Sequence, residues 1–131
     1  MKWQNPGHEY DETYRQMNMK TAFYLYGAGD YGKQFVEIFR DEINILGYID
    51  NNPAKHGTVI NGYMCRSFSE DILKENVGII ITMSQIARVS PIKQLTELGY
   101  ERNKDFFIME DFLSVYHLYK YDKVYFSTIS F

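Results

Sequence analysis

Apolar residues along the chain form short continuous runs that alternate with segments where apolar residues recur every three or four positions. The runs are typical of β-strands and the spaced segments of amphipathic helices. The runs predict strands over residues 21–26, 45–49, 77–82, 106–109 and 123–131. The spacing predicts helices over residues 31–42, 90–98 and 111–120, with shorter helices after Ser69 and, unless the N-terminal arm stays mobile, from about Glu9.

Turn-forming residues separate several of these elements. Asn61-Gly62 favours a tight hairpin turn between two short strands at 58–60 and 63–65. Ser90-Pro91 is a typical helix start, with the serine hydroxyl as the cap and proline at the first helical position. Gly99 stands where a helix commonly ends on glycine.

The alternation of strands and helices predicts an α/β fold. Such an order favours a mostly parallel sheet between two layers of helices, here an αβα arrangement around about five strands. We expect a polar N-terminal arm over residues 1–20 and a core over residues 21–109. A helix and strand over residues 110–131 would complete the sheet or lead into a further domain.

The composition fits one domain in a chain of 131 residues, with 45% hydrophobic and 24% charged residues. The formal net charge is −3 and no basic block occurs, so we expect neither a nucleic-acid partner nor a membrane partner. Cys65 is the single cysteine, which excludes an intrachain disulfide and fits a reducing, cytoplasmic location. The polar N-terminus predicts no signal peptide.

A glycine pattern, GAGDYG at residues 27–32, follows the first predicted strand and enters the next predicted helix. In this context G-x-G-x-x-G indicates a dinucleotide-binding turn. Gly27 would make the sharp turn, Gly29 would let the backbone approach a pyrophosphate, and Gly32 would let helix and strand pack closely. The helix N-terminus would offer its amide groups to the phosphates. Asp30 fits this role only if its side chain points to solvent.

An acidic residue, Asp50, lies 18 residues beyond Gly32 at the end of the second predicted strand. A carboxylate there accepts hydrogen bonds from ribose hydroxyls and repels a 2′-phosphate, which favours NAD over NADP. Neighbouring Asn51 supplies no positive charge to offset that repulsion. We expect Asp50→Ala to weaken nucleotide binding and to leave the fold nearly intact.

Hydroxyl side chains follow the third predicted strand at Thr82 and Ser84. They would either contact the ligand or bond the local backbone, and both roles remain open. The predicted ligand-binding residues are Gly27, Gly29, Asp30, Tyr31, Gly32, Asp50, Asn51, Thr82 and Ser84.

No complete catalytic centre or metal site is predicted. Short-chain dehydrogenases and sugar epimerases use a Tyr-x-x-x-Lys pair to move a proton. Three pairs have this spacing here, two of them in one tyrosine-rich stretch, and only Tyr116/Lys120, on one face of a predicted helix, merits a test. Cys65 has no nearby histidine that could lower its pKa, so we interpret it as a buried or half-buried side chain rather than a nucleophile. The histidines at positions 8, 56 and 117 show no metal-ligand spacing.

Several segments together resemble a family of small Rossmann-type domains: YGAGDYG, GYIDNNPAKHG, VINGY, VGIIIT and LTELGY. These domains are attached to nucleotide-sugar and polysaccharide-modifying enzymes, among them sugar acetyltransferases, dehydratases or epimerases, and methyltransferases. The resemblance covers about residues 21–109 and implies a Rossmann-like fold. It implies that NAD or the nucleotide of a sugar substrate is held by Gly27, Gly29, Gly32 and Asp50, and less directly by Asn51.

These features favour a nucleotide-binding domain that is part of a larger sugar- or polysaccharide-modifying protein. The alternatives are a minimal NAD-dependent sugar oxidoreductase or epimerase, an S-adenosylmethionine-binding domain, and a ligand-free interaction module. The strand predicted at 123–131 carries apolar residues on both faces. Such an edge favours a homodimer or a following catalytic domain as partner.

Overall fold

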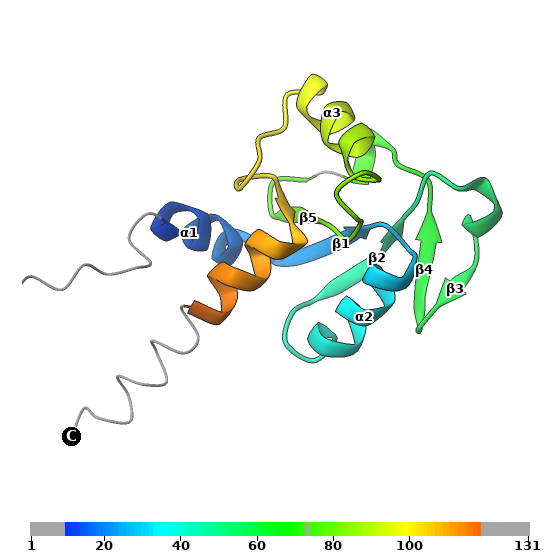
Figure 1. The fold of residues 1–131 in the computed structure, drawn as a ribbon, viewed down its shortest axis with the longest axis horizontal. Helices are drawn as coiled ribbons and strands as arrows, with labels where there is room; N and C mark the ends of the chain where they lie inside the picture. Colours follow the sequence, from blue (N-terminus) through cyan, green and yellow to red (C-terminus); the bar gives the residue numbers. More distant parts are fainter. Residues whose placement is uncertain (1–9, 73, 119–131) are drawn as a thin grey trace, which may run out of the picture.

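A six-stranded sheet lies at the centre of the computed structural model, which describes residues 10–72 and 74–118 (Figure 1). The strand order is β3-β4-β2-β1-β5-β6, and every neighbouring pair is parallel except β3 and β4. The strands are β1 (Ala22–Tyr26), β2 (Ile45–Ile49), β3 (Val59–Ile60), β4 (Tyr63–Arg66), β5 (Val77–Ile81) and β6 (Phe106–Ile108). This confirms the predicted α/β fold, whereas the strand predicted at 123–131 lies outside the described residues.

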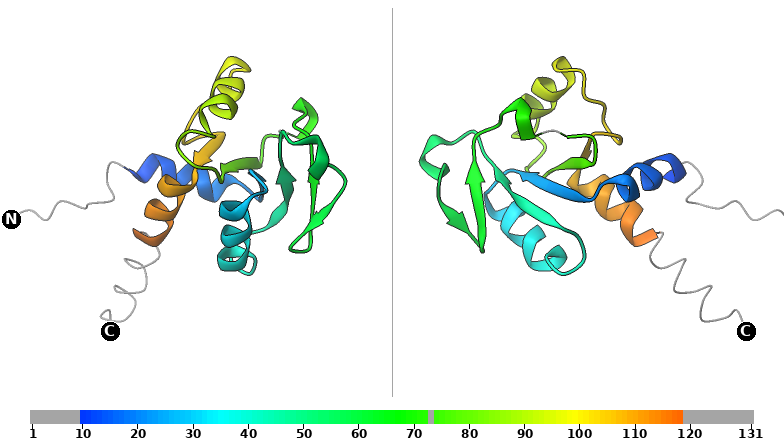
Figure 2. Two further views of the ribbon diagram at one scale, coloured as in Figure 1. Left: turned by 45° about the vertical axis from the view of Figure 1, so that its right-hand side comes forward. Right: turned by 180° about the vertical axis from the view of Figure 1, so that it is seen from behind.

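Helices cover both faces of the sheet, which gives the three layers expected (Figures 1 and 2). Apolar residues of α2 (Asp30–Phe39) and of a helix over residues 109–118 pack on one face, where Met17 of α1 (Asp11–Met19) joins them. On the other face Leu95 of α3 (Val89–Glu97) packs with Ile72, beside the short 3-10 helix η3 (Glu70–Ile72). A second 3-10 turn, η2 (Pro53–Lys55), follows β2.

The central strands are buried on both faces, as the uninterrupted apolar run at 77–82 predicts. Ile80 of β5 faces one core cluster, and its neighbours Ile79 and Ile81 face the other. In the helix over 109–118, Phe112 is 1% exposed and makes edge-to-face contacts with four phenylalanines at centroid distances between 5.6 and 6.2 Å. Each such pair contributes about 0.5–1.5 kcal/mol beyond its buried area, so this helix is firmly docked.

Local turn chemistry explains which boundaries the sequence predicts well. Asn61 and Gly62 have φ of 51° and 86°, the left-handed conformation that a tight hairpin turn between β3 and β4 requires. Gly99 follows α3 with φ of 91°, as a helix-terminating glycine should. The predicted capping role of Ser90 is wrong, because α3 begins at Val89. The chain already turns helically from Ser84, whose carbonyl accepts the Arg88 amide at 3.1 Å.

Tyr48 of β2 is fully buried beneath the start of α2. Within the described part of the chain its hydroxyl has no hydrogen-bond partner. A buried hydroxyl without a partner costs free energy that a phenyl ring does not, so we expect Tyr48→Phe to raise the free energy of unfolding by about 1 kcal/mol. Urea denaturation measures this change, and a loss of stability would show that the hydroxyl is paired.

The same residue makes folding stability depend on alkaline pH. Burial raises the pKa of Tyr48 from 10.0 to about 12. Between those values the unfolded tyrosine loses its proton while the folded one keeps it, so stability falls as the pH rises, by up to about 1.4 kcal/mol per pH unit from this group. In denaturation series at rising pH, Tyr48→Phe is expected to show a smaller decline than wild type.

Candidate functional site

The glycine turn joins the end of β1 to the start of α2. Gly27 leaves the strand with φ of 124°, and its amide donates to the Ile49 carbonyl at 2.7 Å. Gly29 is the N-cap of α2 in an extended conformation, and among the described residues no side chain caps the first amides of the helix. Amides at a helix N-terminus attract anions, because they point outward and carry the positive end of the helix dipole.

The second and third glycines of the pattern have different roles. A Cβ placed on Gly29 would meet no atom within 4 Å, so this residue faces open space. A Cβ placed on Gly32 would lie 2.1 Å from the Gly27 carbonyl oxygen and 3.1 Å from the Tyr48 ring. Gly32 therefore permits the close contact between the turn and α2, while Gly29 keeps the surface above the turn clear.

Asp50 ties the glycine turn to the end of β2. Its Oδ2 accepts the Ala28 amide at 2.9 Å and its Oδ1 accepts the Asn52 amide at 2.8 Å. The ammonium of Lys55 lies 3.8 Å from Oδ2 and donates to the Ala28 carbonyl at 3.2 Å. Asp50 thus holds the shape of the turn as well as placing a negative charge beside it.

These bonds change what we expect of Asp50→Ala. The variant should keep the fold but be less stable than wild type, because the amides of Ala28 and Asn52 both lose their acceptor. Bonds to a charged acceptor are worth about 1.5–3 kcal/mol, and we expect a loss of unfolding free energy in that range. Asp50→Asn, which keeps one oxygen, should lose less. Thermal denaturation compares the variants, and equal stability of Asp50→Ala and wild type would contradict this role.

The loop after β2 is also fixed to α3. The hydroxyl of Tyr26 lies 2.9 Å from Asn51 Oδ1 and 2.7 Å from Gln94 Oε1. Burial raises the pKa of Tyr26, and this keeps its hydroxyl neutral in the folded protein. The side chain of Asn51 is therefore positioned by the end of β1.

A cleft of about 390 Å³ opens above the carboxyl ends of β1, β2 and β5. All of the predicted ligand-binding residues except Gly32 line it. Sequence reasoning missed Lys55, Met83, Ala87, Ser90 and Pro91 among its lining residues. A neighbouring cleft of about 400 Å³ shares Tyr31, Met83 and Ser84 and reaches Met109 and Glu110 after β6. Together they are large enough for a small-molecule ligand.

The hydroxyl side chains after β5 bond the local backbone. Thr82 Oγ1 donates to the Gly27 carbonyl at 2.8 Å, and Thr82 is 2% exposed. Ser84 Oγ accepts the Ala87 amide at 3.3 Å. Both side chains line the cleft while they bond the backbone that shapes it.

Other candidate groups lie elsewhere. Tyr116 donates a hydrogen bond to Glu42 near the amino ends of β1 and β2, the opposite end of the strands from the glycine turn, and Lys120 lies outside the described residues. Cys65 is buried, and burial raises the pKa of its thiol, which disfavours the nucleophilic thiolate. In residues 10–72 and 74–118, no three histidine, cysteine or acidic side chains gather as metal ligands do. Over the same residues, no helix has the length and apolar character needed to cross a bilayer.

Comparison of the chain with protein families matches one family, described as C2185-like, N-terminal, over residues 17–106. The chain therefore belongs to this family. No curated protein matches the chain significantly in sequence.

Two proteins of known structure share the fold. UDP-D-quinovosamine 4-dehydrogenase from Vibrio fischeri is 24% identical with a TM-score of 0.52, over 63% of this chain and 75% of that chain. RSP, a Rex-family repressor, is 14% identical with a TM-score of 0.51, over 88% of this chain and 66% of that chain. The structure of RSP in complex with β-NAD+ and operator DNA is 14% identical with a TM-score of 0.52, over 90% of this chain and 64% of that chain. The chain thus spans about two thirds of the repressor, and the predicted Rossmann-like fold is confirmed.

The RSP complex overturns one expectation. The negative formal net charge and the lack of a basic block led us to exclude a nucleic-acid partner, and that exclusion is wrong. A protein with this fold is found bound to operator DNA together with β-NAD+. Net charge describes a whole domain, whereas DNA contacts depend on how charges are placed on one surface.

Proposed function

We propose that this C2185-like N-terminal domain binds a nucleotide that contains a diphosphate group, either NAD or a nucleotide sugar, in the cleft above its glycine turn. The observation that carries the proposal is the open space in front of Gly29, beside amides of α2 that no side chain in the described part of the chain caps. A diphosphate placed there would accept hydrogen bonds from the helix N-terminus. The ammonium of Lys55 lines the same cleft and adds positive charge.

The ribose of the ligand would lie beside Asp50. Each carboxylate oxygen of Asp50 accepts one backbone amide, and a carboxylate has about four acceptor sites in all. The side chain is 18% exposed, so part of it remains open to ribose hydroxyls. A 2′-phosphate would meet this negative charge, and we therefore propose NAD in preference to NADP.

The comparisons support the ligand class. One similar structure is named for a UDP-sugar substrate and another contains β-NAD+. With the resemblance to domains of sugar-modifying enzymes, they support a role in a larger sugar- or polysaccharide-modifying protein. The setting that we propose is cytoplasmic, which suits the unpaired, buried thiol of Cys65.

Calorimetry with four ligands tests the proposal: NAD, NADP, UDP-glucose and S-adenosylmethionine. We expect NAD or UDP-glucose to bind, and NADP to bind about tenfold more weakly than NAD, which corresponds to about 1.4 kcal/mol of repulsion. Binding of S-adenosylmethionine alone would assign a different cofactor. If none of the four binds, the proposed function is wrong.

A further inference from the structure

The cleft above the glycine turn continues into the neighbouring cleft of about 400 Å³. Tyr31, Met83 and Ser84 line both clefts, and the neighbouring cleft reaches on to Met109 and Glu110 after β6. Tyr31 is the second residue of α2, so a ligand whose diphosphate lies at the start of this helix can extend past the Tyr31 ring. The neighbouring cleft is therefore placed to receive the group that the diphosphate carries at its far end.

The neighbouring cleft combines exposed apolar groups with a few polar ones. Ile86 is 89% exposed and Tyr31 is 47% exposed, so both offer apolar surface to a ligand. The polar side chains are those of Ser84 and Gln85, which follow β5, and of Glu110, which follows β6. Apolar walls with a few polar groups that fix the orientation of a ligand are typical of small-molecule sites.

Arg88 fixes the carboxylate of Glu110 at the start of the helix over residues 109–118. Its guanidinium donates to Glu110 Oε1 at 2.6 Å. The side chain of Arg88 is 13% exposed and that of Glu110 is 54% exposed, so the pair presents its acidic member to solvent. Burial acts to raise the pKa of Glu110, but hydrogen bonds from Arg88 and the backbone outweigh it and leave the pKa below its ordinary value. Glu110 is therefore ionised at neutral pH, and an ionised carboxylate only accepts hydrogen bonds.

The charge of Glu110 decides which part of a ligand can lie beside it. Glu110 is the one charged side chain among the described residues that line the neighbouring cleft. It would repel a phosphate, so the diphosphate would stay at the start of α2 and the group beyond it must supply hydrogen-bond donors. A carboxylate has about four acceptor sites, more than Arg88 and the backbone use. Neighbouring hydroxyl groups of a sugar ring are such donors.

We propose that the neighbouring cleft binds the sugar ring beyond the diphosphate, with the Glu110 carboxylate as the acceptor for its hydroxyl groups, and this rests on the nucleotide binding proposed above. The ring would be the hexose of a nucleotide sugar or the second ribose of NAD, since both carry neighbouring hydroxyls. Gln85 can donate and accept hydrogen bonds with the remaining hydroxyls, and the Tyr31 ring would lie beside the sugar. The ligand would then meet two acids, Asp50 at its first ribose and Glu110 at its far sugar.

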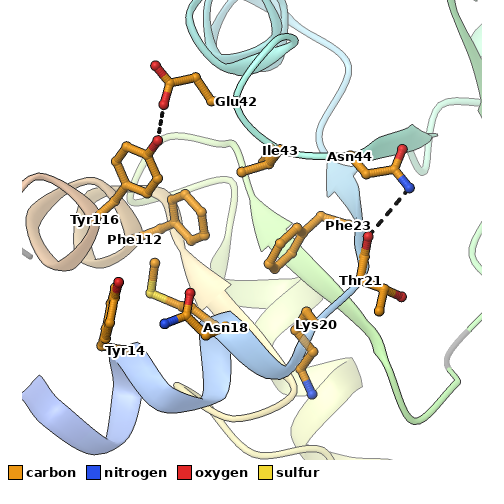
Figure 3. A pocket seen from close by; sticks show the side chains of 11 residues that line it. Tyr14, Asn18, Lys20, Thr21, Phe23, Glu42, Ile43, Asn44, Phe112 and Tyr116 are labelled. Atoms are coloured by element: carbon orange, nitrogen blue, oxygen red, sulfur yellow. Dashed lines mark hydrogen bonds between the residues drawn. The ribbon is translucent and has the colours of Figure 1, made fainter. Parts of the chain in front are cut away.

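NMR on the ¹⁵N-labelled full chain locates the far sugar. UDP-glucose or ADP-ribose should shift the amides of Gln85, Ile86 and Glu110 more than UDP or ADP does. A second cavity, of about 420 Å³, lies at the amino ends of β1 and β2 and shares no lining residue with either cleft (Figure 3). The amide of Asn18, which lines that cavity, is the control and should not respond to the sugar. Sugar-dependent shifts at Asn18 but not at Gln85 and Glu110 would overturn the proposal.

Calorimetry with two pairs of ligands measures the contribution of Glu110. UDP-glucose is compared with UDP, and ADP-ribose with ADP, because each pair differs by its far sugar. We expect Glu110→Ala to lower the affinity ratio of at least one pair about tenfold, and the pair that responds identifies a hexose or a ribose. Glu97→Ala is the matched control. It removes a similarly exposed carboxylate that pairs with Lys93 at 4.0 Å and lines neither cleft, and it should leave both ratios unchanged.

The two proposals fail in different ways. If UDP or ADP binds but Glu110→Ala changes neither ratio, the far-sugar site is wrong and the nucleotide site stands. A drop of the same size in Glu97→Ala would also overturn the role of Glu110. If none of the four ligands binds to the wild type, the proposed nucleotide binding is wrong, and the far-sugar site falls with it.

Discussion

Gly32→Ala is expected to lower the free energy of unfolding by about 3 kcal/mol, near the upper end of overpacking effects. The added methyl group would lie 2.1 Å from the Gly27 carbonyl oxygen and 3.1 Å from the Tyr48 ring. The oxygen belongs to the backbone of the glycine turn and cannot rotate away, so the turn and α2 must move apart. Urea denaturation monitored by circular dichroism measures the loss.

Gly29→Ala is the matched control for that change. It adds the same methyl group three residues earlier, where no atom lies within 4 Å and φ is −93°. Its stability should stay within about 0.5 kcal/mol of wild type, as for most substitutions that disturb no packing. If the two alanine variants are equally stable, the close packing that we assign to Gly32 does not exist.

Gly29→Val is expected to weaken nucleotide binding about 100-fold while the protein stays folded, because a larger side chain would occupy the space that we assign to the diphosphate. The extended backbone of Gly29 accepts a side chain without strain. Calorimetry with the tightest-binding nucleotide gives the affinity, and circular dichroism confirms the fold. Undiminished affinity in a folded Gly29→Val protein would place the ligand elsewhere.

The sequence predicts best those features that depend on neighbouring residues. The apolar run at 77–82 predicts β5, and Asn61-Gly62 predicts the hairpin turn, because both signals are local. The glycine spacing likewise predicts distinct surroundings for Gly29 and Gly32, and the structure has them.

Features that depend on tertiary contacts are not predictable in this way. The pattern places Asp50 at the strand end, but the bond to the Ala28 amide joins residues 22 positions apart. Lys55 enters the cleft because η2 folds back toward the glycine turn, where its ammonium bonds the Ala28 carbonyl. The observed start of α3 likewise differs from the predicted one. The helical turn that begins at Ser84 comes before the Ser90-Pro91 pair from which the helix start was predicted.

The central claim is that the cleft above the glycine turn binds a nucleotide, and mapping NAD and UDP-glucose onto the ¹⁵N-labelled full chain tests it most directly. The account predicts that at least one of them shifts the amides of Ala28, Gly29 and Asp30 at the start of α2, together with Asn51 and Ser84. Amides around the second cavity, such as that of Asn18, should not move. Shifts confined to other surfaces, or none with either nucleotide at millimolar concentrations, would contradict the account.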